Sequence, residues 1–172
     1  GRRVAALKFT QPGAAVGVIP LVYDRGQLVG PTDARTVACY SLETPGEPNW
    51  RYTMPQDVRW IFNAGDGYVG VCSVEGYIRL LDILEGDVVL SAQLPAAAAG
   101  YAEGVIHDDA LLLMIAARSA EGPNPSLVSL DLATGKERWS SAQGYGACGA
   151  GPFALWKLLH VADDVVPMFR RV

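Results

Sequence analysis

One unit that recurs along the chain constrains its fold more than any other feature of the sequence. In the clearest copy, residues 129–139, alternating apolar residues predict a strand, a tight turn and a second strand that ends on Trp139. Asp131 and Thr134 can hydrogen-bond to the turn backbone, and Gly135 supplies a residue that readily adopts a positive φ. Trp139 adds a large flat surface and one N–H group that needs an acceptor.

The same spacing appears twice more along the chain. Asp82, Gly86 and Leu90 repeat it with a leucine in the tryptophan position, while Gly46 and Trp50 repeat the glycine and the tryptophan. Trp50 precedes Leu90 by forty residues, and the next interval is nine residues longer. A period of this length indicates an architecture built from similar supersecondary units.

Four other segments have the form of a β-hairpin, with two apolar runs joined by a short turn rich in Asp and Gly: residues 16–30, 59–72, 104–117 and 158–170. Each of the first three precedes one strand–turn–strand unit, so a repeat contains four strands. A period of about 40–45 residues with four strands predicts a β-propeller. We therefore expect an all-β fold, a partial propeller in one domain over residues 1–172. It would have about three and a half four-stranded antiparallel blades, at residues 15–54, 58–94, 100–142 and, in part, 150–172.

The longer third repeat is explained by an inserted loop at residues 118–126, which is rich in Pro, Gly and Ser. Loops on a rigid scaffold often carry binding residues, so this loop is the best candidate for contact with a protein partner. A tolerated surface insertion is the alternative interpretation.

Composition excludes several classes of protein. Of the 172 residues, 50% are hydrophobic and 19% are charged, which is typical of a globular domain. A net charge of −4 gives no electrostatic basis for nucleic-acid binding, and no apolar run is long enough to span a membrane. The spacing of Cys39, Cys72 and Cys148 does not match that of a zinc site. The sequence leaves open whether two of these cysteines form a disulfide. Cys39 and Cys72 lie in apolar runs, so we expect both in the core.

Two motifs contain residue types that catalytic or binding sites use. His107-Asp108-Asp109 offers acid–base groups, but it occupies a hairpin turn, which is the interpretation we favour. His160 lies near the matching place of the fourth hairpin, and two histidines do not make a metal site. Residues 144–149 match the G-x-G-x-x-G pattern of a phosphate-binding loop. That interpretation would require a helix over residues 153–161. We favour the interpretation that the motif is a glycine-rich link between blades. We therefore assign no catalytic, cofactor-binding or metal-binding residue.

Residues 129–139 resemble the tryptophan-docking motif of the quinoprotein-type propellers, the pyrroloquinoline quinone (PQQ)-like repeat proteins. In that family the Asp, Thr-Gly and Trp positions join adjacent blades. Gly135 and Trp139 match the motif in the third repeat, and the first repeat matches it at its own glycine and tryptophan. The second repeat departs from it, with Glu85 in the threonine position and Leu90 in the tryptophan position. The resemblance implies that Trp139 packs on a neighbouring blade.

The resemblance implies two classes of function. Some members are quinoprotein dehydrogenases that bind PQQ and calcium and oxidise alcohols or sugars, whereas others are scaffolds or sensor domains without a cofactor. This sequence has no adjacent-cysteine pair, and none of its residues can be assigned as a calcium ligand of the dehydrogenases. We therefore expect a non-catalytic protein-interaction or sensor scaffold without a cofactor. A fragment of a PQQ- and calcium-dependent dehydrogenase is the alternative. The resemblance also implies a periplasmic or extracytoplasmic location, which the residues themselves do not establish.

Propellers of this family close with about six to eight blades, more than this chain supplies. We expect its partner to be either the missing blades of the same propeller or another protein. We expect neither nucleic-acid binding nor a membrane-spanning segment. Self-association of two copies through open blade edges is the alternative. Since an open arc would leave a bare strand edge, we favour a fragment of a longer protein.

Overall fold

The computed structural model describes residues 7, 9–10, 19–44, 46–94, 101–119 and 122–140. These residues form three four-stranded sheets and no helix. The first sheet contains β1 (Val22–Asp24), β2 (Gln27–Pro31), β3 (Thr36–Ser41) and β4 (Trp50–Thr53). The second contains β5 (Val58–Gly65), β6 (Tyr68–Ser73), β7 (Tyr77–Asp82) and β8 (Val88–Gln93). The third contains β9 (Tyr101–His107), β10 (Ala110–Ser119), β11 (Gly122–Asp131) and β12 (Glu137–Ser140).

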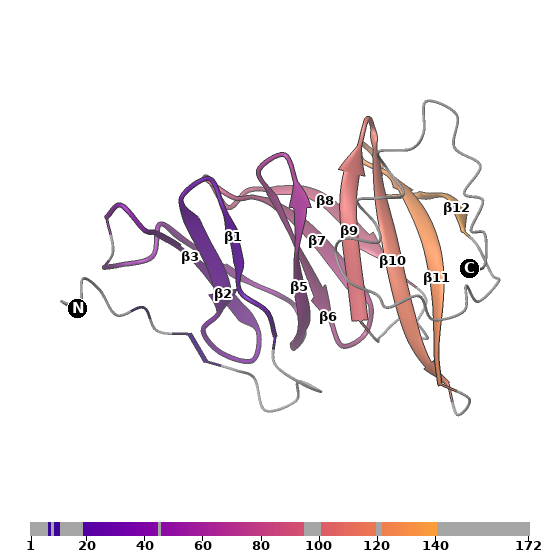
Figure 1. Cartoon of the computed structure of the whole chain (residues 1–172), viewed down its shortest axis with the longest axis horizontal. Coiled ribbons are helices and arrows are strands. Elements are labelled where there is room, and N and C mark those ends of the chain that lie inside the picture. Colours follow the sequence, from indigo (N-terminus) through magenta and orange to yellow (C-terminus); the bar gives the residue numbers. More distant parts are fainter. Residues whose placement is uncertain are drawn as a thin grey trace, which may run out of the picture.

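Each sheet is an antiparallel meander in which consecutive strands pair, and the three sheets lie side by side in chain order (Figure 1). The first strands adjoin each other, because β5 contacts both β1 and β9. Repeated four-stranded sheets that meet along their first strands are the architecture of a β-propeller. The predicted all-β partial propeller is therefore confirmed.

Local residues explain the hairpin turns. Arg25 and Gly26 both have positive φ, as do Asp66 and Gly67, which is the conformation of the tight turns that suit twisted strands. Asp108, in the third hairpin, has a φ of 52°. Three of the four predicted hairpins are confirmed, while the fourth lies outside the described residues, as do Cys148, His160 and the glycine-rich motif.

One backbone hydrogen bond recurs in every sheet and defines equivalent positions. The residue after the third strand donates its N–H to the carbonyl of the first hairpin turn: Leu42 to Gly26 at 3.0 Å, Ile83 to Gly67 at 2.9 Å, and Leu132 to Asp109 at 2.9 Å. The three sheets are therefore copies of one structural repeat.

The core consists of two layers, one on each face of the second sheet. Alternate side chains along a strand point to opposite faces of the sheet. Val69 and Val71 pack with the first sheet, whereas Cys72 and Leu80 pack with the third. Cys39 is also buried, as predicted. Burial raises the pKa of the Cys39 thiol to about 11 and that of Cys72 to about 12, so both act as small apolar residues.

The structure corrects the predicted loop at residues 118–126. β10 and β11 continue as a ladder to Ser119 opposite Gly122, so the extra residues lengthen a hairpin that extends beyond the other strands (Figure 1). Pro123 and Pro125 favoured a loop in the sequence. Within the described part, however, β12 pairs only with Val128–Leu130, which leaves the rest of β11 as an edge where proline is tolerated.

Candidate functional site

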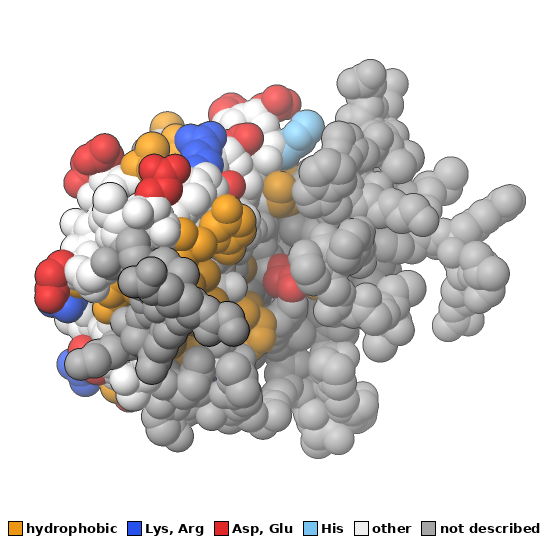
Figure 2. Space-filling model, turned by 60° about the vertical axis from the view of Figure 1, so that its left-hand side comes forward, with side chains coloured by type: hydrophobic (Ala, Val, Ile, Leu, Met, Phe, Trp, Pro, Cys, Tyr) orange, Lys and Arg blue, Asp and Glu red, His pale blue; other side chains and the backbone are white. Residues whose placement is uncertain are grey.

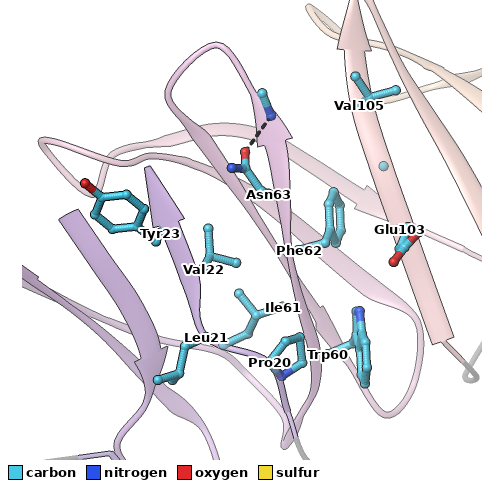
Figure 3. Close-up of a pocket in the computed structure, with 12 residues that line it drawn as sticks. Pro20, Leu21, Val22, Tyr23, Trp60, Ile61, Phe62, Asn63, Glu103 and Val105 are labelled. Atoms are coloured by element: carbon cyan, nitrogen blue, oxygen red, sulfur yellow. Dashed lines mark hydrogen bonds between the residues drawn. The ribbon is translucent and has the colours of Figure 1, made fainter. Parts of the chain in front are cut away.

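A hollow of about 500 Å³ opens where the first strands of the three sheets meet. Its lining comes from the segment that enters β1 and from β5 and β9 (Figure 3): Pro20, Leu21, Val22, Tyr23, Trp60, Ile61, Phe62, Asn63, Gly65, Glu103, Gly104 and Val105. In a propeller the first strands surround the central axis. All three sheets contribute to this hollow, which is the candidate site.

Two glycines let β5, β6 and β9 approach closely around Phe62, whose side chain lies in the wall of the hollow. A Cβ placed on Gly70 would overlap the Phe62 ring, and one placed on Gly104 would lie 2.7 Å from it. Asn63 accepts the N–H of Gly65 through its Oδ1 at 2.8 Å, which fixes its amide at the end of β5 (Figure 3). The wall formed by β5 is therefore positioned by packing and one local hydrogen bond.

The charge of the hollow comes from one carboxyl group. Glu103 is the only Asp, Glu, Lys or Arg among the described lining residues, and burial raises the pKa of its carboxyl. Leu21 is 46% exposed, and Tyr23 is also exposed. The surface therefore offers mostly apolar and aromatic contact area.

A second functional element is the junction between the first and second sheets, here called the first junction. Trp50 donates its Nε1–H to the carbonyl oxygen of Ile83 at 3.0 Å, and the same oxygen lies 3.4 Å from Sγ of Cys39. Gly86 has a φ of 78°, and a Cβ placed on it would lie 2.7 Å from the Trp50 ring. The tryptophan of one sheet is therefore seated on the glycine turn of the next.

The junction between the second and third sheets, the second junction, uses other side chains. Leu90 has the strand position of Trp50, since it pairs with Leu80 as Trp50 pairs with Cys39, and it is buried in an apolar cluster. Gly135 has a φ of 67°, and a Cβ placed on it would overlap the carbonyl oxygen of Ser91. The predicted positive φ of Gly135 is confirmed.

Trp139 occupies the same position in the third sheet, opposite Ser129, and it is 48% exposed. Its predicted packing on a further blade stays a prediction, because the residues after Ser140 lie outside the described part. The turn that precedes it is built as predicted. Asp131 Oδ1 accepts the backbone N–H and the hydroxyl of Thr134, each at 2.8 Å.

Sequence reasoning missed the charged cluster around Arg138. Its guanidinium donates two bonds of 2.7 Å to Asp109 and two bonds, of 2.6 and 3.2 Å, to Asp131. The hydrogen bonds from Arg138, followed by those from Thr134, lower the pKa of Asp131 to about 2, and Arg138 also lowers the pKa of Asp109. The cluster ties the β9–β10 turn to β12. A pairing over 29 residues leaves no local sequence signal.

The acid–base interpretation of residues 107–109 gains no support from the geometry. Asp108 and Asp109 form the turn between β9 and β10, as predicted, and the His107 Nε2 lies 3.7 Å from an exposed Asp108 oxygen. Within the described residues, no group of three or more His, Cys, Asp or Glu side chains is placed to hold a metal ion. The described residues also contain no helix that could cross a membrane.

No protein-family model matches the sequence, and no curated protein is significantly similar to it. Several solved structures resemble the fold. BamB from Moraxella catarrhalis aligns with a TM-score of 0.58 and 16% identity, over 73% of this chain and 35% of BamB. A europium-containing methanol dehydrogenase aligns with a TM-score of 0.51 and 13% identity, over 70% of this chain and 24% of the enzyme. The WD40 domain of Toxoplasma gondii coronin aligns with a TM-score of 0.54 and 11% identity, over 71% of this chain and 33% of that protein.

These similarities define the class of the protein as a partial β-propeller. More particularly, its structural neighbours include BamB, a methanol dehydrogenase and a WD40 domain, so the similarity is to the propeller fold that these proteins share. At these identities the similarity concerns the fold alone. The chain spans about a third or less of each of the three proteins described.

Proposed function

We propose that this chain is a non-catalytic segment of a PQQ-like β-propeller and that it serves as a protein-interaction scaffold. The observation that carries the proposal is the hollow at β1, β5 and β9, which is open and lined mostly by apolar and aromatic side chains. Such a surface favours an extended apolar segment of a partner protein, with a few polar groups to set its orientation. The similarity to BamB is consistent with a scaffold role.

The first junction supports the PQQ-like assignment. Trp50 packs on Gly86 and donates to the Ile83 carbonyl, which is the contact expected of a tryptophan-docking motif between consecutive blades. The third sheet has the glycine and tryptophan of the same motif at Gly135 and Trp139.

The described lining residues do not fit PQQ with calcium. PQQ carries three carboxylates, which call for cationic partners, and the lining has no Lys or Arg. Calcium takes about six to eight oxygen ligands, whereas the ionisable oxygens of the lining come from Glu103 and the phenol of Tyr23. The donor set therefore favours the scaffold over the alternative of a dehydrogenase fragment.

The surface also has the layout of a binding face. Figure 2 shows hydrophobic side chains exposed on one face, with one acidic side chain beside them and further acidic and basic side chains above and to the left. Protein interfaces commonly combine apolar contact area with polar groups.

Peptides selected against the chain from a displayed library would test the proposal by fluorescence polarisation. Leu21→Asp places a charge in the hollow and is expected to weaken binding about tenfold or more. The matched control is Leu84→Asp, the same change at a leucine that is 45% exposed in the β7–β8 turn, against 46% for Leu21. Circular dichroism would verify that both variants fold. Equal binding to both variants would contradict the proposed site.

The enzyme alternative needs its own measurement. The chain would be titrated with PQQ and calcium, followed by absorbance, and then assayed for dye reduction with a primary alcohol. We expect neither binding nor turnover. Alcohol-dependent dye reduction would overturn the non-catalytic proposal.

A further inference from the structure

The β7–β8 turn and the start of β8 expose three branched aliphatic side chains that lie close together in the sequence. Leu84 is 45% exposed, Val88 is 42% exposed and Val89 is 44% exposed. We call these three residues the middle patch, because they belong to the second sheet, which lies between the other two (Figure 1). Since the first and third sheets flank this sheet, the patch does not lie at an open end of the arc.

The repeat itself does not require these side chains. The recurring backbone hydrogen bond and the glycine of the turn align the three sheets, so that Gly86 matches Gly46 and Gly135. At the positions of the middle patch, the other two sheets have no leucine, isoleucine or valine. The first sheet has Glu43, Pro48 and Asn49, and the third has Ala133, Glu137 and Arg138. The turn therefore forms without branched aliphatic residues, and the fold alone does not account for the patch.

A β-bulge explains why two consecutive valines are both exposed. Leu90 pairs with Leu80 and Val88 pairs with Leu81, so Val89 is an extra residue in β8. Successive side chains of a regular strand point to opposite faces, and a bulge interrupts this alternation. Both valines are exposed, whereas Leu90, the next residue, is buried. The bulge therefore adds two apolar side chains to the surface that begins at the turn.

The charge around the middle patch has one sign. The turn contains Asp82, Glu85 and Asp87, and no Lys or Arg occurs between residues 80 and 94. Asp82 shapes the turn, because its Oδ1 accepts the N–H groups of Leu84 and Glu85 at 2.8 and 3.0 Å. Glu85 and Asp87 are exposed, and in the described part of the chain neither forms an ion pair. Their carboxylates are therefore placed to attract a cationic group.

We propose that the middle patch binds a segment of a partner protein that combines apolar side chains with Lys or Arg. The apolar side chains of the partner cover Leu84, Val88 and Val89, and its cationic side chains lie against Glu85 and Asp87. Apolar contact with charge complementarity beside it gives such an interface both affinity and specificity. None of these five residues lines the hollow, so failure of this proposal would leave the proposed function standing.

A displayed peptide library would be depleted on a chain carrying both Val88→Ser and Val89→Ser, and then selected on the parent chain. The depletion removes peptides that bind elsewhere, including the hollow. We expect the remaining peptides to contain Lys or Arg among apolar residues. In fluorescence polarisation with labelled copies, they should bind the serine variant about tenfold or more weakly than the parent. Circular dichroism would verify that the variant folds, as expected for two exposed positions.

The contribution of charge is measured in a chain carrying both Glu85→Gln and Asp87→Asn. We expect the selected peptides to bind this chain about threefold or more weakly at low ionic strength, with a smaller difference in high salt. The matched control carries both Glu43→Gln and Glu47→Gln, which removes two exposed carboxylates from the equivalent turn of the first sheet. The control should bind the peptides like the parent.

Three outcomes would overturn the proposal. The selection could yield no peptide that distinguishes the parent from the serine variant, or its peptides could lack Lys and Arg. Equal weakening in the two carboxylate variants would show that the net charge of the chain, rather than the patch, attracts the peptides. Peptides that respond to Leu21→Asp and not to the serine variant would support the hollow and contradict the middle patch.

Discussion

The first junction differs from the second in the side chain at its centre and in the contacts around that side chain. Trp50 joins the first and second sheets through one hydrogen bond and a close contact with Gly86. Arg25 adds a bond of 2.9 Å to the Asp66 carbonyl. At the second junction, buried Leu90 lies in an apolar cluster. The repeat therefore tolerates loss of the tryptophan where a leucine packed in such a cluster fills the same position.

Trp50→Ala should have the largest effect, a loss of about 3 kcal/mol of unfolding free energy, because it removes a large partly buried ring and its hydrogen bond. Trp139→Ala should cost much less, about 1 kcal/mol, since that ring is 48% exposed. The resemblance implies that Trp139 packs on a neighbouring blade, but the described residues leave its ring half exposed. Urea unfolding of both variants gives the comparison, and equal losses would show that the two tryptophans have equivalent roles.

Gly135→Ala is expected to cost about 2–3 kcal/mol, from the positive φ and from overlap with a backbone atom that cannot move independently. The added Cβ would meet the Ser91 carbonyl oxygen. Gly86→Ala, with a similar φ, meets the ring of Trp50 instead, so it should cost less in a Trp50→Ala background than in the parent chain. A double-mutant cycle measured by urea unfolding gives this coupling. Additive effects would mean that Gly86 is required for its φ alone.

Leu90→Trp tests whether the two junctions are interchangeable. Leu90 is buried in a filled cluster, so the larger ring should destabilise the chain by about 1–2 kcal/mol through overpacking. The matched change is Trp50→Leu at the first junction, which should destabilise by leaving space over Gly86. Thermal unfolding of both variants is the measurement. A stabilised Leu90→Trp chain would show that the second junction has room for the aromatic side chain.

Local patterns predicted the hairpins and the turn at Asp131, Thr134 and Gly135, because these features depend on residues within a few positions of each other. The hollow could not be predicted in this way, since its lining comes from three strands whose proximity depends on sheet packing. The Arg138 cluster likewise joins Asp109 and Asp131 across one sheet. The extended β10–β11 hairpin was misread because Pro123 and Pro125 favour a loop locally, although an edge strand accepts them.

The smallest effect concerns the pH dependence of stability at the Arg138 cluster. The pKa of Asp131 is lowered from the ordinary value of 3.8 to about 2, and that of Asp109 is lowered as well. Since the unfolded chain binds protons more readily, this contribution is complete above pH 4 and is lost as the pH falls toward 2. The thermal midpoint should therefore decline over this range, and less so in Arg138→Gln. Because these groups are exposed, the difference should be modest and should shrink in high salt. Parallel pH profiles for the two chains would mean that the cluster orders the β9–β10 turn without contributing to the acid dependence of folding.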